Sequence, residues 1–163
     1  SPFEYLSKGP EVPGVDEHAR KIVRRACETV LKPCFGTTVA SSKKLESLPT
    51  VSDIRDVLKR SKSRYHALRE PELLRLISSE PLIVIGGRII GFHRVMNIND
   101  TTTNEEKRTK RAIVRELMLS TSGNIKKESV LKACEKIVGI NPAKILQEMC
   151  TSSGGVWSID LTK

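Results

Sequence analysis

The segment 141–161, NPAKILQEMCTSSGGVWSIDL, constrains this chain more than any other stretch, because it predicts a short helix, a turn and a hairpin in that order. Asn141 is a favourable N-cap, and Pro142 fits the first helical position because no backbone N–H is needed there. Gly154-Gly155 allows the positive φ angles of a tight hairpin turn. The strand formers around Trp157 then complete the second strand.

The first half of the chain ends in the same way. A helix opening near Pro71 is followed by an apolar strand at 82–85, the pair Gly86 and Gly87, and a second strand at 88–92. Two such endings, each a helix followed by a two-stranded wing, predict a mostly α fold with small β-hairpin wings (α+β), arranged as tandem winged-helix domains.

The polar run NINDTTTN at 97–104 divides the two halves and predicts a linker. We therefore expect an extended leader at 1–15, a first winged-helix domain at 16–96 and a second at 105–163. The secondary structure of 41–69 is not fixed by the sequence. The glycine pairs Gly86-Gly87 and Gly154-Gly155 are expected to have structural roles.

Helical spacing predicts which side chains of the second domain face inward. In the helix after the linker, Ile113 and Leu117 recur on one face. In the next helix, predicted over about 127–138, Leu131 and Val138 share an apolar stripe. Trp157 is the only tryptophan, and we expect it to be substantially buried against Ile113, Leu117 or Leu131.

The composition excludes several classes of protein. At 163 residues, 38% hydrophobic and 29% charged, the chain is typical of a folded globular protein. It contains no apolar run of the ~20 residues that a membrane span needs and no secretory signal pattern. Only 4% of residues are aromatic, which argues against a base-stacking platform for single strands. Because the chain begins with Ser1, we expect it to be a piece of a longer protein.

Metal binding and catalysis are not indicated. The four cysteines form no CxxC pair and stand apart from the histidines, so neither a zinc site nor a cofactor is expected. Cys27 and Cys134 fall on apolar helix faces, where a reduced cysteine behaves as a small hydrophobe. We find no phosphate-binding loop and no nucleophile placed beside a histidine, and GGRIIG lacks the spacing of a dinucleotide fingerprint. The sequence therefore predicts a protein that is not an enzyme.

The net charge of +9 fits a polyanionic partner, although basic solvated faces are equally common. The cations gather on the first helix of each half and in a short loop around Tyr65. The candidate nucleic-acid or partner contacts are Arg20, Arg24, Lys59, Arg60, Lys62, Arg64, Lys107, Arg108, Lys110, Arg111, Arg115 and Lys144. On the helix after the linker, the motif KRTKR is predicted to lie on the outer face.

Specific base readout is not favoured. A DNA-reading winged helix places its last helix in the major groove, with basic or amide side chains on the bases. Here that helix offers Lys144 but also Glu148, and its counterpart in the first half carries Glu70 and Glu72 against Arg75. Carboxylates would repel phosphates, so only weak, sequence-independent contact with DNA is expected.

The segment 105–161, above all KILQEMCTSSGGVWSIDL, resembles the C-terminal region of subunit five of eukaryotic RNA polymerase III, the Sin-type subunit. The likeness consists of a charged helix after a polar linker, Cys150 just after a helix, and the hairpin ending in Trp157. It covers the last third of the chain closely and the remainder loosely, and 41–69 is longer than in that family.

The resemblance implies tandem winged helices without catalytic residues, in a nuclear DNA-directed RNA polymerase subunit. It implies partners among the other RNA polymerase III subunits, notably the partner in an initiation-factor-F-like heterodimer. The expected role is a protein–protein assembly module that supports polymerase integrity and class III transcription. The alternative is a DNA-binding winged-helix domain of a transcription factor.

Overall fold

The structure, a computed structural model, describes residues 15–31, 45–77 and 82–163. It is an α+β fold with two small antiparallel sheets among its described residues. The predicted leader lies outside the described residues, except that Val15 already begins the first helix.

The described residues of the first half form three α-helices, two short 3-10 helices and a hairpin. Its elements are α2 (Val15–Leu31), η3 (Leu45–Ser47), α3 (Val51–Arg60), η4 (Arg64–Ala67), α4 (Glu70–Ile77), β1 (Leu82–Ile85) and β2 (Arg88–Gly91). Helix α3 begins where it does because Thr50 and Asp53 form a capping box, in which each side chain accepts a hydrogen bond from the other's backbone N–H. This cap settles the start of a helix in a region that the sequence left open.

A short helix that the sequence did not predict, α5 (Phe92–Met96), follows the first hairpin and leads into the second half. The elements that follow are α6 (Asn104–Leu119), β3 (Asn124–Ile125), α7 (Lys127–Ala133), α8 (Pro142–Met149), β4 (Cys150–Ser153) and β5 (Val156–Ile159). The caps fall where the sequence predicts them. Thr103 accepts from the Glu106 N–H at 3.1 Å, and Asn141 accepts from the Ala143 N–H at 3.1 Å.

The two halves share an order of elements. In the second half, β5 lies between β3 and β4, all antiparallel. In the first half, β2 pairs with β1 on one side and meets residues 49–50 on the other, through an antiparallel bridge between Thr50 and Arg88. The Ile89 N–H donates to the Pro49 carbonyl at 2.8 Å. A single bridge therefore stands where the second half has strand β3.

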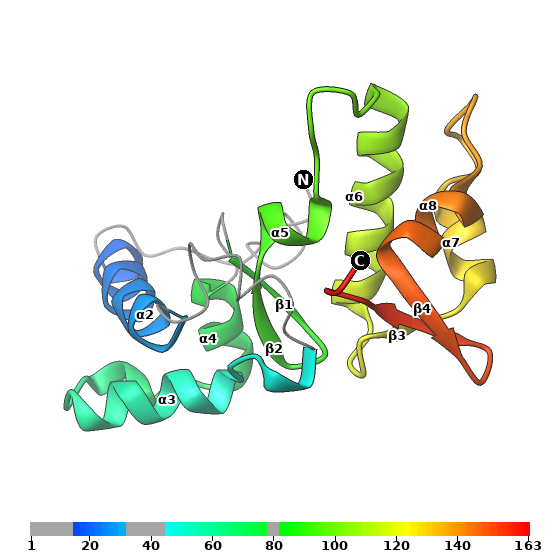
Figure 1. Cartoon of the computed structure of the whole chain (residues 1–163). Helices are drawn as coiled ribbons and strands as arrows, with labels where there is room; N and C mark the ends of the chain where they lie inside the picture. The colour runs from blue at the N-terminus through cyan, green and yellow to red at the C-terminus, as the bar shows by residue number, and fades with distance from the viewer. Residues whose placement is uncertain (1–14, 32–44, 78–81) are drawn as a thin grey trace.

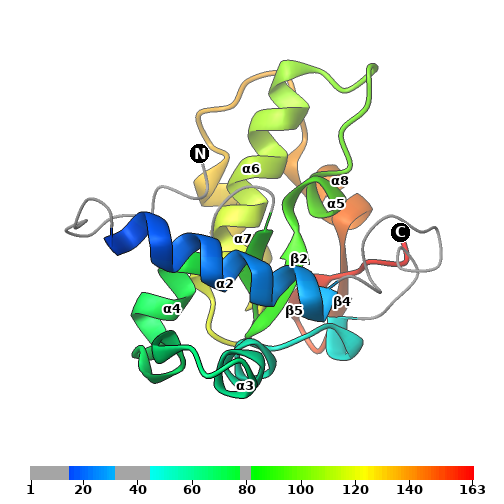
Figure 2. The ribbon, with the colours of Figure 1, turned by 90° about the vertical axis from the view of Figure 1, so that its left-hand side faces the viewer.

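The hairpin β1–β2 lies in the middle of the molecule, between α2, α3 and α4 on one side and the second half on the other (Figure 1). Helix α2 lies across the outer side of the first half (Figure 2). The buried hydrophobic side chains form two clusters, and the hairpin contributes to both. Leu82, Val84 and Ile89 belong to the first cluster, and Ile83, Ile85 and Ile90 to the second.

This division follows from the pleat of the strands, since successive side chains point to opposite faces. All four residues of β1 are buried, as expected of a strand covered on both faces. The hydrophobic packing thus divides along the hairpin, and Phe92, Val95 and Met96 of α5 join the second cluster. The division of the chain into two domains at 97–104 remains a prediction.

Close backbone approaches and a side-chain hydrogen bond also join the halves. The tip of the hairpin meets the turn after α6 so closely that a Cβ on Gly86 would lie 2.9 Å from the Ser122 carbonyl oxygen. A Cβ on Gly123 would lie 3.2 Å from the Gly86 Cα. The Arg94 guanidinium of α5 donates to the Leu161 carbonyl near the C-terminus.

Three expectations about the second cluster need correction. Trp157 is half-buried rather than substantially buried, and it packs against the cluster from its rim. Helix α7 ends at Ala133, several residues earlier than the apolar spacing predicted. Val138 lies beyond the end of α7 and is 83% exposed, and Leu131 within α7 is 40% exposed, so neither completes an inward stripe. Ile113 and Leu117 are fully buried, as predicted.

Candidate partner-contact surface

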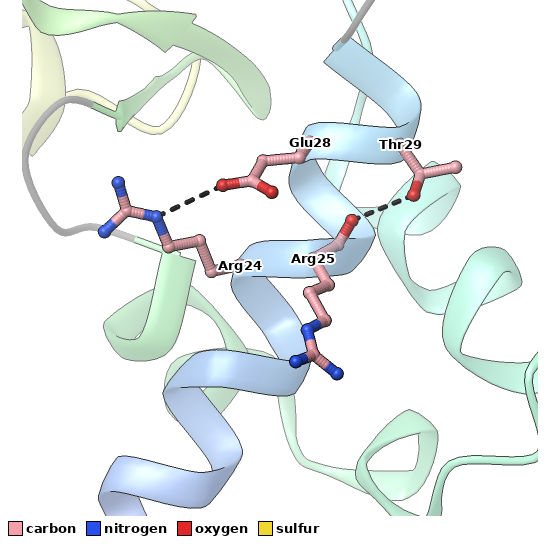
Figure 3. Close-up of polar contacts among 4 residues, drawn as sticks. All are labelled: Arg24, Arg25, Glu28 and Thr29. Carbon is pink, nitrogen blue, oxygen red and sulfur yellow. Dashed lines mark hydrogen bonds and ion pairs between the residues drawn. The ribbon is translucent and has the colours of Figure 1, made fainter.

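Helix α2 carries the first group of predicted contacts. Arg24 is exposed, and its Nε lies 3.4 Å from Glu28 Oε1 one turn later, as Figure 3 shows. The neighbouring Thr29 hydroxyl donates to the Arg25 carbonyl, while the Arg25 side chain extends away from this pair. Arg20 is half-buried. An exposed i,i+4 ion pair contributes little to stability, but it neutralises much of the charge that Arg24 would offer a partner.

The second group surrounds Tyr65. Lys59 and Arg60 lie exposed in the last turn of α3, and Lys62 lies exposed in the following turn with a φ of 57°. The Arg64 guanidinium lies 5.1 Å above the Tyr65 ring and donates to its hydroxyl. The Tyr65 ring also meets the ring of His18 in α2 in an edge-on arrangement, with 5.8 Å between the ring centroids. Tyr65 therefore links η4 to α2, and Arg64 packs on the Tyr65 ring.

The third group lies on α6, and here one expectation is wrong. Lys110 is 8% exposed, and its ammonium donates to the Asn97 carbonyl at 3.0 Å, so it does not belong to an outer face. Thr109 beside it is also buried. The reason is the rotation of the helix, because Lys110 shares the buried stripe that continues through Ile113, Val114 and Leu117. Its long side chain reaches past the core to a backbone acceptor.

The remaining cations of α6 divide by exposure. Lys107 is half-buried, whereas Arg108, Arg111 and Arg115 are exposed. None of these three arginines forms an ion pair or a hydrogen bond through its side chain within the described residues. They form the largest set of exposed, unneutralised cations on a single described helix.

The last helix and hairpin of each half are electrically balanced. Along α8 and the β4–β5 hairpin the charged residues are Lys144 and Glu148, both exposed. Along α4 and the β1–β2 hairpin, Glu70 and Glu72 oppose Arg75 and Arg88. Arg88 donates to the Leu48 carbonyl at 2.8 Å, and Glu72 accepts from Arg69 at 2.9 Å. These elements offer no cationic surface for a phosphate backbone.

A small polar cavity lies between α5, α6, α8 and the C-terminal residues. It is lined by Lys110, Arg94, Lys163, Glu148 and Asp160, among others. Its cations are already engaged by backbone carbonyls, since Lys163 donates to the carbonyls of Gln147 and Cys150. Hydrogen bonds from the Thr151 and Thr162 side chains lower the pKa of Asp160 to about 2. The hydrogen bonds around the cavity therefore connect α5, α6 and Lys163 to neighbouring backbone carbonyls.

The cysteines of the described residues carry no activated thiol. Cys27, Cys134 and Cys150 are free and buried, and burial raises the pKa of Cys27 and of Cys150 to about 12. The described residues contain no group of three histidine, cysteine or acidic side chains able to hold a metal ion. In the same part of the chain, no helix combines the length and apolar character required to cross a membrane.

One residue of the exposed face of α6, Leu119, was not predicted from the sequence. Leu119 is 40% exposed at the end of α6, one turn beyond Arg115. Its position four residues after Arg115 could have indicated it, because residues at i and i+4 share a helix face.

Comparisons with protein-family models, with curated proteins and with solved structures found no match to this chain.

Proposed function

We propose that this chain is a non-catalytic assembly and stability module of an RNA polymerase III subunit, formed by two winged-helix units and acting in the nucleus through protein contacts. The observation that carries this proposal is the distribution of charge. The helix and hairpin with which a winged helix meets DNA have no net charge in either half, whereas the first helix of the second half carries three exposed arginines, Arg108, Arg111 and Arg115.

The order of elements supports the winged-helix assignment. From α6 to β5 the chain runs helix, strand, helix, helix, strand, strand, with β5 central in the sheet. The first half repeats this order if the bridge at Thr50 takes the place of the first strand. Gly154-Gly155 and Gly86-Gly87 form the wing tips, all with positive φ. Winged helices serve both DNA and protein partners, so the fold alone does not decide the function.

Protein partners are favoured over base readout by the residues of α8. A reading helix needs several basic or amide side chains aimed at base edges. Helix α8 offers Lys144 and Gln147, with Glu148 beside them. The resemblance to the Sin-type subunit supplies the identity of the partners, namely the other subunits of RNA polymerase III and above all the partner in its heterodimer.

Isolation of the tagged chain with its bound partners from cells tests the proposal. The tagged chain is isolated after nuclease treatment, and subunits of RNA polymerases I, II and III are quantified by mass spectrometry. We expect enrichment of polymerase III subunits alone, and fluorescence of a tagged chain in the nucleus. The matched negative control is Leu146→Asp, which places a charge at a fully buried position of the second cluster. No enrichment, or enrichment lost with nuclease, would contradict the proposal.

A DNA-binding transcription factor domain is the alternative function. Winged helices that bind DNA are common, and the net charge of +9 favours a polyanion. Duplex binding with a strong sequence preference is the result that would favour it.

A further inference from the structure

We infer that the exposed face of α6 is a docking surface for an acidic helix of a partner protein. This surface, called the arginine stripe, consists of Arg108, Arg111, Arg115 and Leu119, all exposed. The inference deepens the proposed function and rests on it, since it names the chemistry of the partner that the module meets.

The helix geometry brings these side chains together. Spacings of three and four residues place them on one face, because an α-helix has 3.6 residues per turn. From Arg108 to Leu119 the stripe is about 16 Å long at 1.5 Å per residue. The opposite face of α6 is fixed by Ile113, Val114 and Leu117 in the core, so the stripe cannot rotate inward. It is therefore a permanent outward row of three guanidinium groups that ends in an apolar side chain.

The charge along this row is uncompensated. Lys107 and Arg111 are separated by four residues, as are Arg111 and Arg115, and like charges at this spacing destabilise a helix. Helix α2 shows the opposite arrangement, in which Glu28 neutralises Arg24 four residues earlier (Figure 3). Since α6 has no such pairing for the stripe within the described residues, carboxylates from outside the chain would remove the repulsion.

The chemistry of the stripe favours a protein over a nucleic acid. Guanidinium groups bind carboxylates in a bidentate manner, and arginine is enriched at the centres of protein interfaces. Leu119 gives the row an apolar end, 40% exposed, which a phosphate backbone would not cover. An acidic helix with carboxylates three and four residues apart and an apolar residue one turn further matches all four side chains.

A peptide titration tests this inference. The probe is a fluorescent helical peptide with three glutamates on one face and a leucine one turn beyond, and its control has glutamine at the three glutamate positions. Binding to the whole chain is followed by anisotropy, and a duplex DNA is titrated in parallel. We expect the acidic peptide to bind and its glutamine control not to bind, with an affinity that falls as salt is added, and the duplex to bind only weakly.

Variants locate the binding face. Arg111→Gln with Arg115→Gln should weaken peptide binding about tenfold. The matched control, Lys132→Gln with Lys136→Gln, removes the same charge from exposed positions of α7 and the turn after it, and should change binding less than about twofold. Leu119→Ser should weaken the peptide complex and leave any DNA binding unchanged. Circular dichroism should show every variant folded, since each changed side chain is exposed.

Three outcomes would overturn the inference. One is a peptide that does not bind, and another is binding that is equally sensitive to the α7 control. The third is DNA binding that requires Arg111 and Arg115 but not Leu119, without peptide binding, which would make the stripe a phosphate contact. Recovery from cells separates the two proposals. If the wild type and the stripe variant recover polymerase III equally, the stripe inference fails and the module stands. If neither the wild type nor the stripe variant recovers polymerase III but the acidic peptide binds, the proposed polymerase III function fails and the inference about the arginine stripe stands.

Discussion

Trp157 lies at the rim of the second cluster, opposite Ile125 in the β3–β5 pair. Ile159, two residues further along β5, points to the same face of the strand and is buried. Trp157 lies nearer the edge of the cluster, so part of its indole remains in solvent. The sequence predicted Trp157 to be buried against residues such as Leu117; Leu117 is fully buried, but Trp157 packs on the cluster only from its rim.

We expect Trp157→Ala to lower the free energy of unfolding by about 2 kcal/mol, less than the ~3–5 kcal/mol of a fully buried aromatic residue. Leu117→Ala, at a fully buried site, should cost more, about 3–4 kcal/mol. Urea unfolding followed by circular dichroism measures both. A larger loss for Trp157→Ala than for Leu117→Ala would show that the indole is the centre of the core.

Asp160 provides a pH-dependent test. Its pKa in the folded chain is about 2, below the ordinary value of 3.8, chiefly because the Thr151 hydroxyl donates to it. A lowered folded-state pKa means that the ionised carboxylate stabilises the fold above about pH 4, and that this contribution is lost as the pH falls from about 4 to about 2. Asp160→Asn should therefore be less stable than the wild type at neutral pH, with a gap that closes toward pH 2. A gap independent of pH would contradict this account.

At the scale of elements, local rules predicted the caps at Thr103 and Asn141 and both hairpins, because these depend on neighbouring residues. They failed where packing from distant segments decides. The apolar spacing continued past α7, yet the helix ends at Ala133, and Val138 is left in solvent.

The cations of α6 show the same limit of sequence-based prediction, because packing against distant segments decides their exposure. The sequence identified the cations of α6 as a set, but their exposure depends on how α5 and the linker fix the rotation of that helix. Lys110 is consequently buried and donates to the Asn97 carbonyl, whereas Arg108, Arg111 and Arg115 are exposed.

The contact between the hairpin tip and the turn after α6 is testable with neighbouring glycines. Gly86 and Gly87 have φ angles of +56° and +77°, so alanine at either position carries a strain of roughly 1–2 kcal/mol. A Cβ at Gly86 would also lie 2.9 Å from a backbone oxygen, whereas at Gly87 it would meet nothing within 4 Å. Gly86→Ala should therefore be less stable than Gly87→Ala by about 1–3 kcal/mol. Equal losses in urea unfolding would mean that this contact is loose.

At the scale of the whole molecule, the shared hairpin predicts that the two halves unfold together. Trp157 is the only tryptophan and reports on the second half, whereas far-UV circular dichroism reports on the helices of both. Because β1–β2 supplies side chains to both clusters, we expect the two signals to give the same urea midpoint, as a two-state transition requires. Separate midpoints would show that the halves are independent domains.

We propose that this molecule binds proteins and does not read DNA sequence. The most direct measurement is a titration of the whole chain against a panel of duplexes of different sequence at increasing salt. We expect weak binding, on the order of 10⁻⁴–10⁻⁶ M at physiological salt, that falls steeply with added salt and shows no preferred sequence.

In the same titration, Arg111→Ala with Arg115→Ala should weaken this contact more than Lys144→Ala with Gln147→Ala, because α6 carries three exposed arginines whereas Lys144 of α8 lies beside the exposed Glu148. Lys110 is left unchanged, since its ammonium holds the Asn97 carbonyl. One duplex bound far more tightly than the others, with a preference that Lys144→Ala abolishes, would show that α8 reads bases and would contradict the account.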